Sequence, residues 1–165
     1  MSTRDQAYRQ FVEDVGDVMD EHGFPHMAGR VVGSLLVCIP PERALDELAD
    51  DLQASKGSIS MATQLLLRVG VIEKVSIPGE RRHFYRIQPG FWLDTFARKD
   101  EELDRYRQVG EAGLRLLAEE PVESKGRLLE MLAFIDFVAQ ELPVFVERWR
   151  ECRKSLLERR MESIA

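Results

Sequence analysis

The chain has 165 residues, which is long enough to bury a hydrophobic core without disulfides or structural metal ions. Hydrophobic residues make up 44% of it and charged residues 32%, a composition typical of a globular protein and unlike that of a disordered tail. The formal net charge of −6 argues against a nonspecific coat for nucleic acid, which would be basic throughout. We therefore expect one domain, or one small domain with a long appendage.

The cysteines and the apolar segments of the sequence indicate the cellular compartment in which the protein is expected. Cys38 and Cys152 are far apart in the sequence and form no disulfide framework. The first ten residues are too polar for a signal peptide. The longest apolar run, residues 31–39, is interrupted by Gly33 and Ser34 and is too short to cross a bilayer. We expect a cytoplasmic protein with no membrane partner and with reduced thiols.

The first third of the chain predicts three helices. Apolar residues at helical spacing predict one over about residues 4–22, which Gly23 ends. Pro25 suits the first turn of a second helix that runs to about Cys38 and is apolar on most sides, so it should lie at the centre of the core. A third helix, over about residues 45–53, has an acidic outer face that is unsuited to lying on phosphate.

The positive charge of this acidic chain is concentrated in residues 55–86. This stretch holds six basic and two acidic residues, a net charge of +4, so the remainder of the chain carries −10. Ser55 can cap a helix that ends at Gly70, and two strands over about residues 71–77 and 81–87 follow it. A local charge of this sign points to a polyanionic partner.

On a 3.6-residue wheel, the helix after Ser55 has two different faces. The apolar face, which should lie in the core, consists of Ile59, Ala62, Leu65, Leu66 and Val69. The opposite face is small, polar or long and basic, and consists of Gly57, Ser60, Met61, Gln64 and Arg68. Such a face suits close approach to the major groove of DNA. Ser55, Lys56 and Ser58 lie at the N-terminal end of the helix, where a phosphate is favoured.

The outer face of this helix could be a solvated polar face or a DNA-binding face, and the predicted turn between the two strands decides between them. Taken alone, a polar face is more often just a solvated face. The turn Pro78-Gly79-Glu80 is followed by Arg81 and Arg82, which form a basic tip where a wing would contact the minor groove or the flanking backbone. Helix and hairpin together favour binding to double-stranded DNA.

The helix, the turn and the hairpin together resemble those of a known family. The segment LDELADDLQASKGSISMATQLLLRVGVIEKVSIPGERRHFYRI resembles the winged helix-turn-helix of MarR-type transcriptional regulators, and its SKGSIS phrase and PGERRHFY wing resemble the GbsR-like branch in particular. The resemblance is strong over residues 25–87 and looser beyond. It implies a homodimeric regulator on a pseudo-palindromic operator, with the first and last helices at the dimer interface. It also implies a reading helix that includes residues 55–60 and Gln64, and a wing over residues 79–82.

The last part of the chain predicts two long helices, over about residues 91–119 and from residue 122 past Trp149, separated by Pro121. Pro143 predicts a kink or a break in the second. That helix has an apolar seam at Leu128, Leu132, Ile135, Ala139, Leu142, Val146 and Trp149. A second apolar row consists of Met131, Phe134, Val138, Phe145 and Cys152. A helix that is apolar on two flanks must bury both, and one partner could be a second subunit.

These patterns predict a mainly α fold, a winged helix-turn-helix with long C-terminal dimerisation helices. The expected parts are an N-terminal helix contributing to dimerisation (residues 1–24), a DNA-binding domain (residues 25–90) and a helical dimerisation and effector region (residues 91–165). The candidate contacts for a small-molecule effector are the aromatic residues Trp92, Phe96, Phe134 and Trp149, although packing is the favoured role for them.

Other functions find less support in the residues. Cys38 could sense oxidants, but an apolar helix favours an inert core thiol, and Cys152 is favoured as a small apolar residue despite its basic neighbours. His22 and His26 flank a turn and do not suggest a metal site. The sequence shows no nucleophile paired with a histidine and no phosphate loop, so we expect neither an enzyme nor a cofactor. The alternative function is a winged-helix module that binds another protein without reading DNA.

Overall fold

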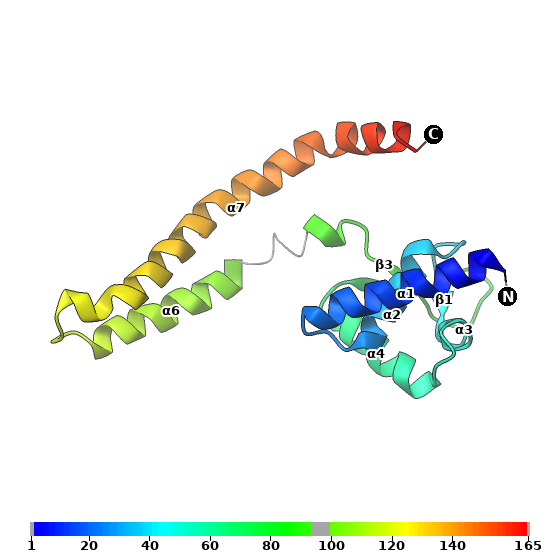
Figure 1. Ribbon diagram of the computed structural model, residues 1–165, viewed down its shortest axis with the longest axis horizontal. Coiled ribbons are helices and arrows are strands. Elements are labelled where there is room, and N and C mark those ends of the chain that lie inside the picture. The colour runs from blue at the N-terminus through cyan, green and yellow to red at the C-terminus, as the bar shows by residue number, and fades with distance from the viewer. Residues whose placement is uncertain (1, 94–99, 165) are drawn as a thin grey trace. The chain divides into compact units, whose positions relative to one another are not determined.

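The computed structural model describes residues 2–93 and 100–164, and it divides the chain into two compact units, residues 1–91 and 92–165 (Figure 1). The first unit is a bundle of four helices with a small antiparallel sheet of strand order β1-β3-β2. Its elements are α1 (Thr3–Glu21), α2 (His26–Val37), β1 (Arg43–Ala44), α3 (Leu45–Asp51), α4 (Lys56–Arg68), β2 (Ile72–Val75) and β3 (Phe84–Ile87). This is the winged helix-turn-helix predicted from the sequence.

The sheet differs from the prediction in two ways. The strands of the hairpin are shorter than expected, because only Ile72–Val75 and Phe84–Ile87 pair, with Val75 opposite Phe84. Between them the chain turns at Gly79, whose φ of +88° is one that glycine adopts without strain. The sequence also gave no sign of β1, whose two residues pair with β3, Arg43 with Tyr85 and Ala44 with Phe84. This short strand fixes the start of α3 against the wing.

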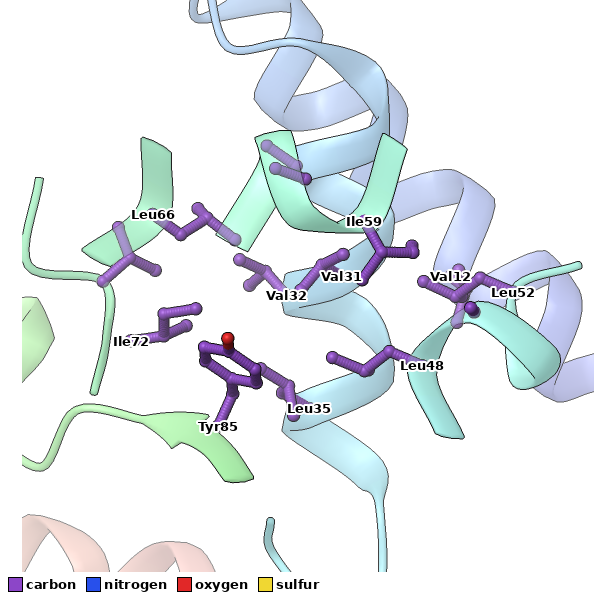
Figure 2. Packing of buried hydrophobic residues seen from close by; sticks show 14 residues of the cluster. Val12, Val31, Val32, Leu35, Leu48, Leu52, Ile59, Leu66, Ile72 and Tyr85 are labelled. Atoms are coloured by element: carbon purple, nitrogen blue, oxygen red, sulfur yellow. The ribbon is translucent and has the colours of Figure 1, made fainter. Parts of the chain in front are cut away.

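A single hydrophobic core holds the first unit together, and α2 lies at its centre as expected (Figure 2). Side chains from every helix of the unit and from β2 and β3 meet in it, among them Val12, Val31, Leu35, Leu48, Leu52, Ile59, Leu66, Ile72 and Tyr85. The prediction for α4 was wrong at one position. Val69 is 46% exposed, because it is the C-cap residue and no longer follows the helical wheel. Thr63, which was not assigned to the core, is buried and donates its hydroxyl to the carbonyl of Ile59 at 2.9 Å.

Glycines let α1 and α2 approach each other closely. A Cβ atom built on Gly29 would lie 2.7 Å from the Cα of Gly16 and 2.8 Å from the carbonyl oxygen of Val15. A Cβ on Gly33 would lie 3.1 Å from the Cα of Val12. Since these neighbours are backbone atoms, they cannot turn aside as a side chain does. The absence of a Cβ therefore sets the distance between α1 and the central helix.

The second unit contains α6 (Asp100–Leu116) and α7 (Val122–Glu162), which pack against each other as an antiparallel hairpin (Figure 1). Residues 94–99, within the first of the two long helices expected here, lie outside the described residues. Of the kink or break predicted at Pro143, the break does not occur. The helix continues through the proline to Glu162, and Figure 1 shows it curving along its length. Among the described residues, no helix is long and apolar enough to cross a membrane.

The two apolar flanks expected on α7 have different surroundings. One flank packs on α6, where the side chains of Leu128 and Leu132 lie against Gly113 and Gly110. Ile135 on this flank is buried. An ion pair of 3.1 Å between Arg107 Nε and Asp136 Oδ1 also joins the two helices. The second row is only partly exposed, since Met131 and Val138 are half-buried and Met131 also lies against Gly110, whereas Phe134 and Phe145 are exposed. Phe137 and Val144, which lie outside that row, are exposed as well.

Candidate nucleic-acid interface

The N-terminal end of α4 is open to solvent and capped by a side chain. Ser55 Oγ accepts a hydrogen bond of 3.1 Å from the amide of Ser58, as the sequence predicted. Ser55, Lys56 and Gly57 are exposed, and Ser58 is half-buried. The first amides of a helix have no partner within it and carry the positive end of the helix dipole, so an anion is favoured here.

The outer face of α4 presents the side chains that the wheel assigned to it. Met61 is 75% exposed, Gln64 and Arg68 are also exposed, and Ser60 is half-buried. Gln64 Nε2 donates to Ser60 Oγ at 3.4 Å, which orients the amide along the face. The face therefore combines an apolar contact, an amide donor and acceptor, and a cation within three turns of one helix.

At the wing, the two arginines that the sequence treated alike have different surroundings. Arg81 is exposed, as is Gly79 at the tip of the turn. Arg82 instead turns back to the first turn of α3, where its Nη1 lies 3.2 Å from Glu47 Oε1 and 3.4 Å from Asp46 Oδ2. Its Nε lies 3.3 Å from Glu80 Oε2. The hydrogen bond to Glu80 and the nearby carboxylates raise the pKa of the Arg82 guanidinium.

Sequence reasoning missed this contact because Asp46 and Glu47 precede Arg82 by more than thirty residues. A signal was present, since the first turn of an acidic helix is a favourable partner for an arginine that the fold brings near it. A second pair joins the two strands of the hairpin, where Arg86 Nε lies 2.6 Å from Glu73 Oε1 in directly opposed positions.

These pairs change how the local positive charge is distributed. Of the six basic residues in the segment 55–86, Arg82 and Arg86 have carboxylate partners. Lys74 lies over the ring of Tyr85, 5.9 Å from its centroid. Within the described part of the chain, Lys56, Arg68 and Arg81 have no carboxylate partner. These three cations, at both ends of α4 and at the wing, are the ones available to an external anion.

Two of the four candidate effector contacts, Phe134 and Trp149, lie far apart on α7. Trp92 and Phe134 are exposed, Trp149 is half-buried, and Phe96 lies outside the described residues. Phe134 and Trp149 are fifteen residues apart on α7, which at 1.5 Å per residue is about 22 Å along the helix. One small molecule cannot contact both in the same chain.

The two thiols also differ from each other. Cys38 is half-buried at the end of α2, and burial raises the pKa of its thiol, which opposes formation of the reactive thiolate. Cys152 is exposed on α7, whereas the sequence favoured it as part of an apolar stripe. Among the residues that the structure describes, neither thiol lies in a group of side chains that could hold a metal ion.

The helices α2, α3 and α4 pack with a small sheet, the outer face of α4 is exposed, and the β2–β3 hairpin follows α4 directly in the chain. This arrangement defines the class of winged helix-turn-helix proteins. Comparison with known proteins agrees. A family model described as an MmpR5-like MarR family transcriptional regulator matches residues 90–153. The HTH-type transcriptional regulator MmpR5 of Mycobacterium tuberculosis is 32% identical over 135 residues, which cover 80% of this chain and 82% of that protein. The chain therefore belongs to the MarR family of transcriptional regulators, and it is not an enzyme.

Two further matches place it within the family. The HTH-type transcriptional repressor GbsR of Bacillus subtilis is 27% identical over 88 residues, covering 53% of this chain and 48% of that protein. The resemblance to the GbsR-like branch thus has support, at a lower identity than that to MmpR5. A solved structure described as a transcriptional regulator is 28% identical, covers 88% of this chain and 99% of its own, and superimposes with a TM-score of 0.76.

Proposed function

We propose that this regulator binds double-stranded DNA sequence-specifically, as a homodimer on a pseudo-palindromic operator. The observation that supports this most is the exposed outer face of α4, with unpaired cations at both of its ends and a third on the wing. A polar face alone would be explained by solvation. The clustering of cations without carboxylate partners on one motif of an acidic chain favours an anion from outside the molecule.

In the proposed mechanism, α4 enters the major groove and the wing lies on the flanking backbone. Ser60, Met61 and Gln64 contact base edges, Met61 by touching a thymine methyl group. A second group of residues contacts or closely approaches phosphates and so fixes the position of the protein along the duplex. This group consists of Ser55, Lys56, Gly57, Ser58, Arg68, Gly79 and Arg81. Two subunits would place their reading helices in successive major grooves roughly 34 Å apart.

Arg82 has a different part in this proposal. Its guanidinium holds the wing against α3 in the free protein, so in the first instance it positions Arg81 and the turn. Contact between Arg82 and a phosphate would require it to exchange its carboxylate partners for the DNA. We therefore assign most of the wing's phosphate binding to Arg81.

The proposed dimer uses the exposed apolar side chains of α7, because Phe134, Phe137 and Val144 are large apolar side chains left in water on one helix. Residues 1–24 contribute on the resemblance to the family. Sedimentation equilibrium should give a dimer at micromolar concentration, and the double variant F134E/F137E should give a folded monomer. A wild-type monomer would remove this part of the proposal.

We also infer control by a small-molecule effector at the aromatic residues of the second unit, Trp92, Phe96, Phe134 and Trp149. The geometry of α7 implies that Phe134 and Trp149 of one chain would belong to different sites. Trp92 and Trp149 are the only tryptophans of the chain, so W92F and W149F assign any change in fluorescence to one position. The expected result is that a compound that quenches one of them also weakens DNA binding. We also propose that the regulator is cytoplasmic, because it must be in the same compartment as the DNA that it binds.

Fluorescence anisotropy with fragments of the source genome tests the proposal. Bound fragments are selected first, and the dissociation constant of the best is then measured against salt concentration. We expect a linear fall of log K with log salt and a symmetric half-site spacing. If no fragment binds in a salt-sensitive manner, the DNA-binding proposal fails, and the alternative of a winged-helix module that binds another protein gains support.

A further inference from the structure

We propose that the cavity beside the wing is a binding site for a small cation joined to a flat apolar body, and that the Arg82 guanidinium occupies its cation position when no ligand is present. The residues that line it are Pro40, Glu42, Arg43, Glu47, Ile77, Glu80, Arg82 and Phe84. It is separate from the outer face of α4, and the inference does not depend on DNA binding.

The cavity has the size and the construction of a small-molecule site. Its volume is about 410 Å³, within the range of ligand pockets in proteins. Three segments distant in sequence form its walls, namely the loop after α2, the first turn of α3 and the wing. The β1–β3 pairing fixes two of these segments relative to each other, since Ala44 at the start of α3 is opposite Phe84.

The contacts of Arg82 show what chemistry the site accepts. Its guanidinium lies against the carboxylates of Glu47 and Glu80 at 3.2 and 3.3 Å. It also lies over the ring of Phe84, with Cζ 5.2 Å from the ring centroid. Carboxylates on one side and an aromatic face on the other are the surroundings that bind organic cations. The protein's own side chain is thus the first occupant of this position.

The charge of the lining selects a cation and not an anion. Three carboxylates, Glu42, Glu47 and Glu80, line the cavity against two arginines. Arg43 is committed to the backbone, since its guanidinium donates to the carbonyls of Ile39, Pro40 and Glu42 at 3.0 to 3.2 Å. Once Arg82 swings into solvent, the carboxylates are in excess and need a replacement positive charge.

One of these carboxylates is already held in position for a ligand. Glu47 Oε2 accepts a hydrogen bond of 3.0 Å from the amide of Ala44, while Oε1 faces the guanidinium. The remaining wall is apolar and consists of Pro40, Ile77 and Phe84. A ligand with a planar hydrocarbon part would bury it there, so the structure favours an aryl-amine or aryl-guanidine over an inorganic cation.

The test uses the full-length protein and two probes of nearly the same shape. Phenylguanidine is a cation with a flat apolar body, and phenylurea is its neutral counterpart. Binding is followed by the chemical shifts of the Ile77 and Phe84 amides in two-dimensional NMR spectra. We expect saturable shifts at these residues with phenylguanidine and none with phenylurea. Equal binding of the two, or shifts confined to other parts of the chain, would overturn the proposal.

Two variants and a matched control test the role of Arg82. R82A removes the competing guanidinium and should tighten phenylguanidine binding roughly tenfold. E80Q removes a carboxylate from an exposed turn and should weaken it. R81A is the control, because Arg81 is adjacent and exposed but has no carboxylate partner in the described chain, and it should bind the probe as the wild type does.

The NMR spectrum itself reports whether each variant is folded, since the amides of α1, α2 and α4 should keep their positions. If R82A disturbs them, R82Q replaces it, because glutamine retains the first part of the arginine side chain and a polar end without the charge. A folded Arg82 variant that binds phenylguanidine no more tightly than the wild type would disprove occupation of the site by the guanidinium.

Discussion

The hydroxyl of Tyr8 in α1 donates a hydrogen bond to the carboxylate of Asp51 at the end of α3. The same carboxylate accepts a hydrogen bond of 2.8 Å from Ser34 Oγ, which is buried in α2. One acidic group therefore joins the N-terminal helix α1, the central helix α2 and α3, the helix that precedes α4. Because α3 determines where α4 begins, this carboxylate connects the position of α1 to that of the candidate DNA-binding surface.

Replacing Tyr8 with phenylalanine should destabilise the protein by about 1 kcal/mol, the usual net value of one hydrogen bond. Y8F removes only the hydroxyl, so the ring keeps its packing against the core. The measurement is the midpoint of urea unfolding with an unchanged slope. S34A should give an effect of similar direction through the same carboxylate. Unchanged stability in Y8F would mean that water replaces the bond without loss.

The same contact predicts a pH dependence at high pH. Burial and the hydrogen bond to Asp51 raise the pKa of Tyr8 from 10.0 to about 12. The folded state therefore favours the protonated hydroxyl more than the unfolded state does. This contribution to stability is complete below pH 10 and is lost as the pH rises towards 12. The difference in unfolding free energy between wild type and Y8F should narrow over this window, and a constant difference would contradict the assignment.

The sequence predicted the helix ends of the first unit well, because local chemistry determines them. Ser55 caps α4 through its own side chain, and Gly23 and Gly70 have φ values of +82° and +76° just beyond α1 and α4. No distant part of the chain is needed for these features. The outer face of α4 was predictable for the same reason, since helical periodicity divides core from surface wherever the helix is regular.

What the sequence could not predict depends on contacts between distant segments. Arg43–Ala44 has no strand pattern of its own and becomes a strand only because β3 lies beside it. Arg81 and Arg82 are equivalent in the sequence, and only the folded chain brings Asp46 and Glu47 to one of them. The sequence resemblance was also strongest over the winged helix, whereas the family model matches residues 90–153. Helical periodicity in that region indicated two long helices but did not identify a family.

The glycines of the helices allow a comparison between two substitutions of the same kind. G29A should destabilise the protein by roughly 1–3 kcal/mol, because its Cβ would lie 2.7 and 2.8 Å from backbone atoms of α1. G126A in α7 should stabilise it by up to about 1 kcal/mol, since a Cβ there meets nothing within 4 Å and alanine is the better helix former. Thermal unfolding followed by circular dichroism measures both. A stabilising shift in G29A would show that helix propensity, and not close packing, governs Gly29.

Because Ser55 caps α4, one substitution at this position should destabilise the protein and another should not. S55A removes the acceptor for the Ser58 amide and should cost about 1 kcal/mol. S55D retains an acceptor at the same position and should be close to the wild type in urea unfolding. In the proposed complex the added negative charge of S55D would repel phosphate, so it should weaken DNA binding while leaving stability unchanged. Equal loss of stability in both variants would argue against capping by this side chain.

The two arginines of the wing give the most direct test of the proposed interface. R81A removes an unpaired cation, so DNA affinity should fall and the slope of log K against log salt should shrink by about one. R82A removes a cation whose charge Asp46, Glu47 and Glu80 already offset, so its slope should change less. Anisotropy titrations at several salt concentrations measure both slopes on the same operator. Equal slope changes would mean that Arg82 leaves its carboxylates for a phosphate when DNA binds, and unchanged slopes in both would remove the wing from the interface.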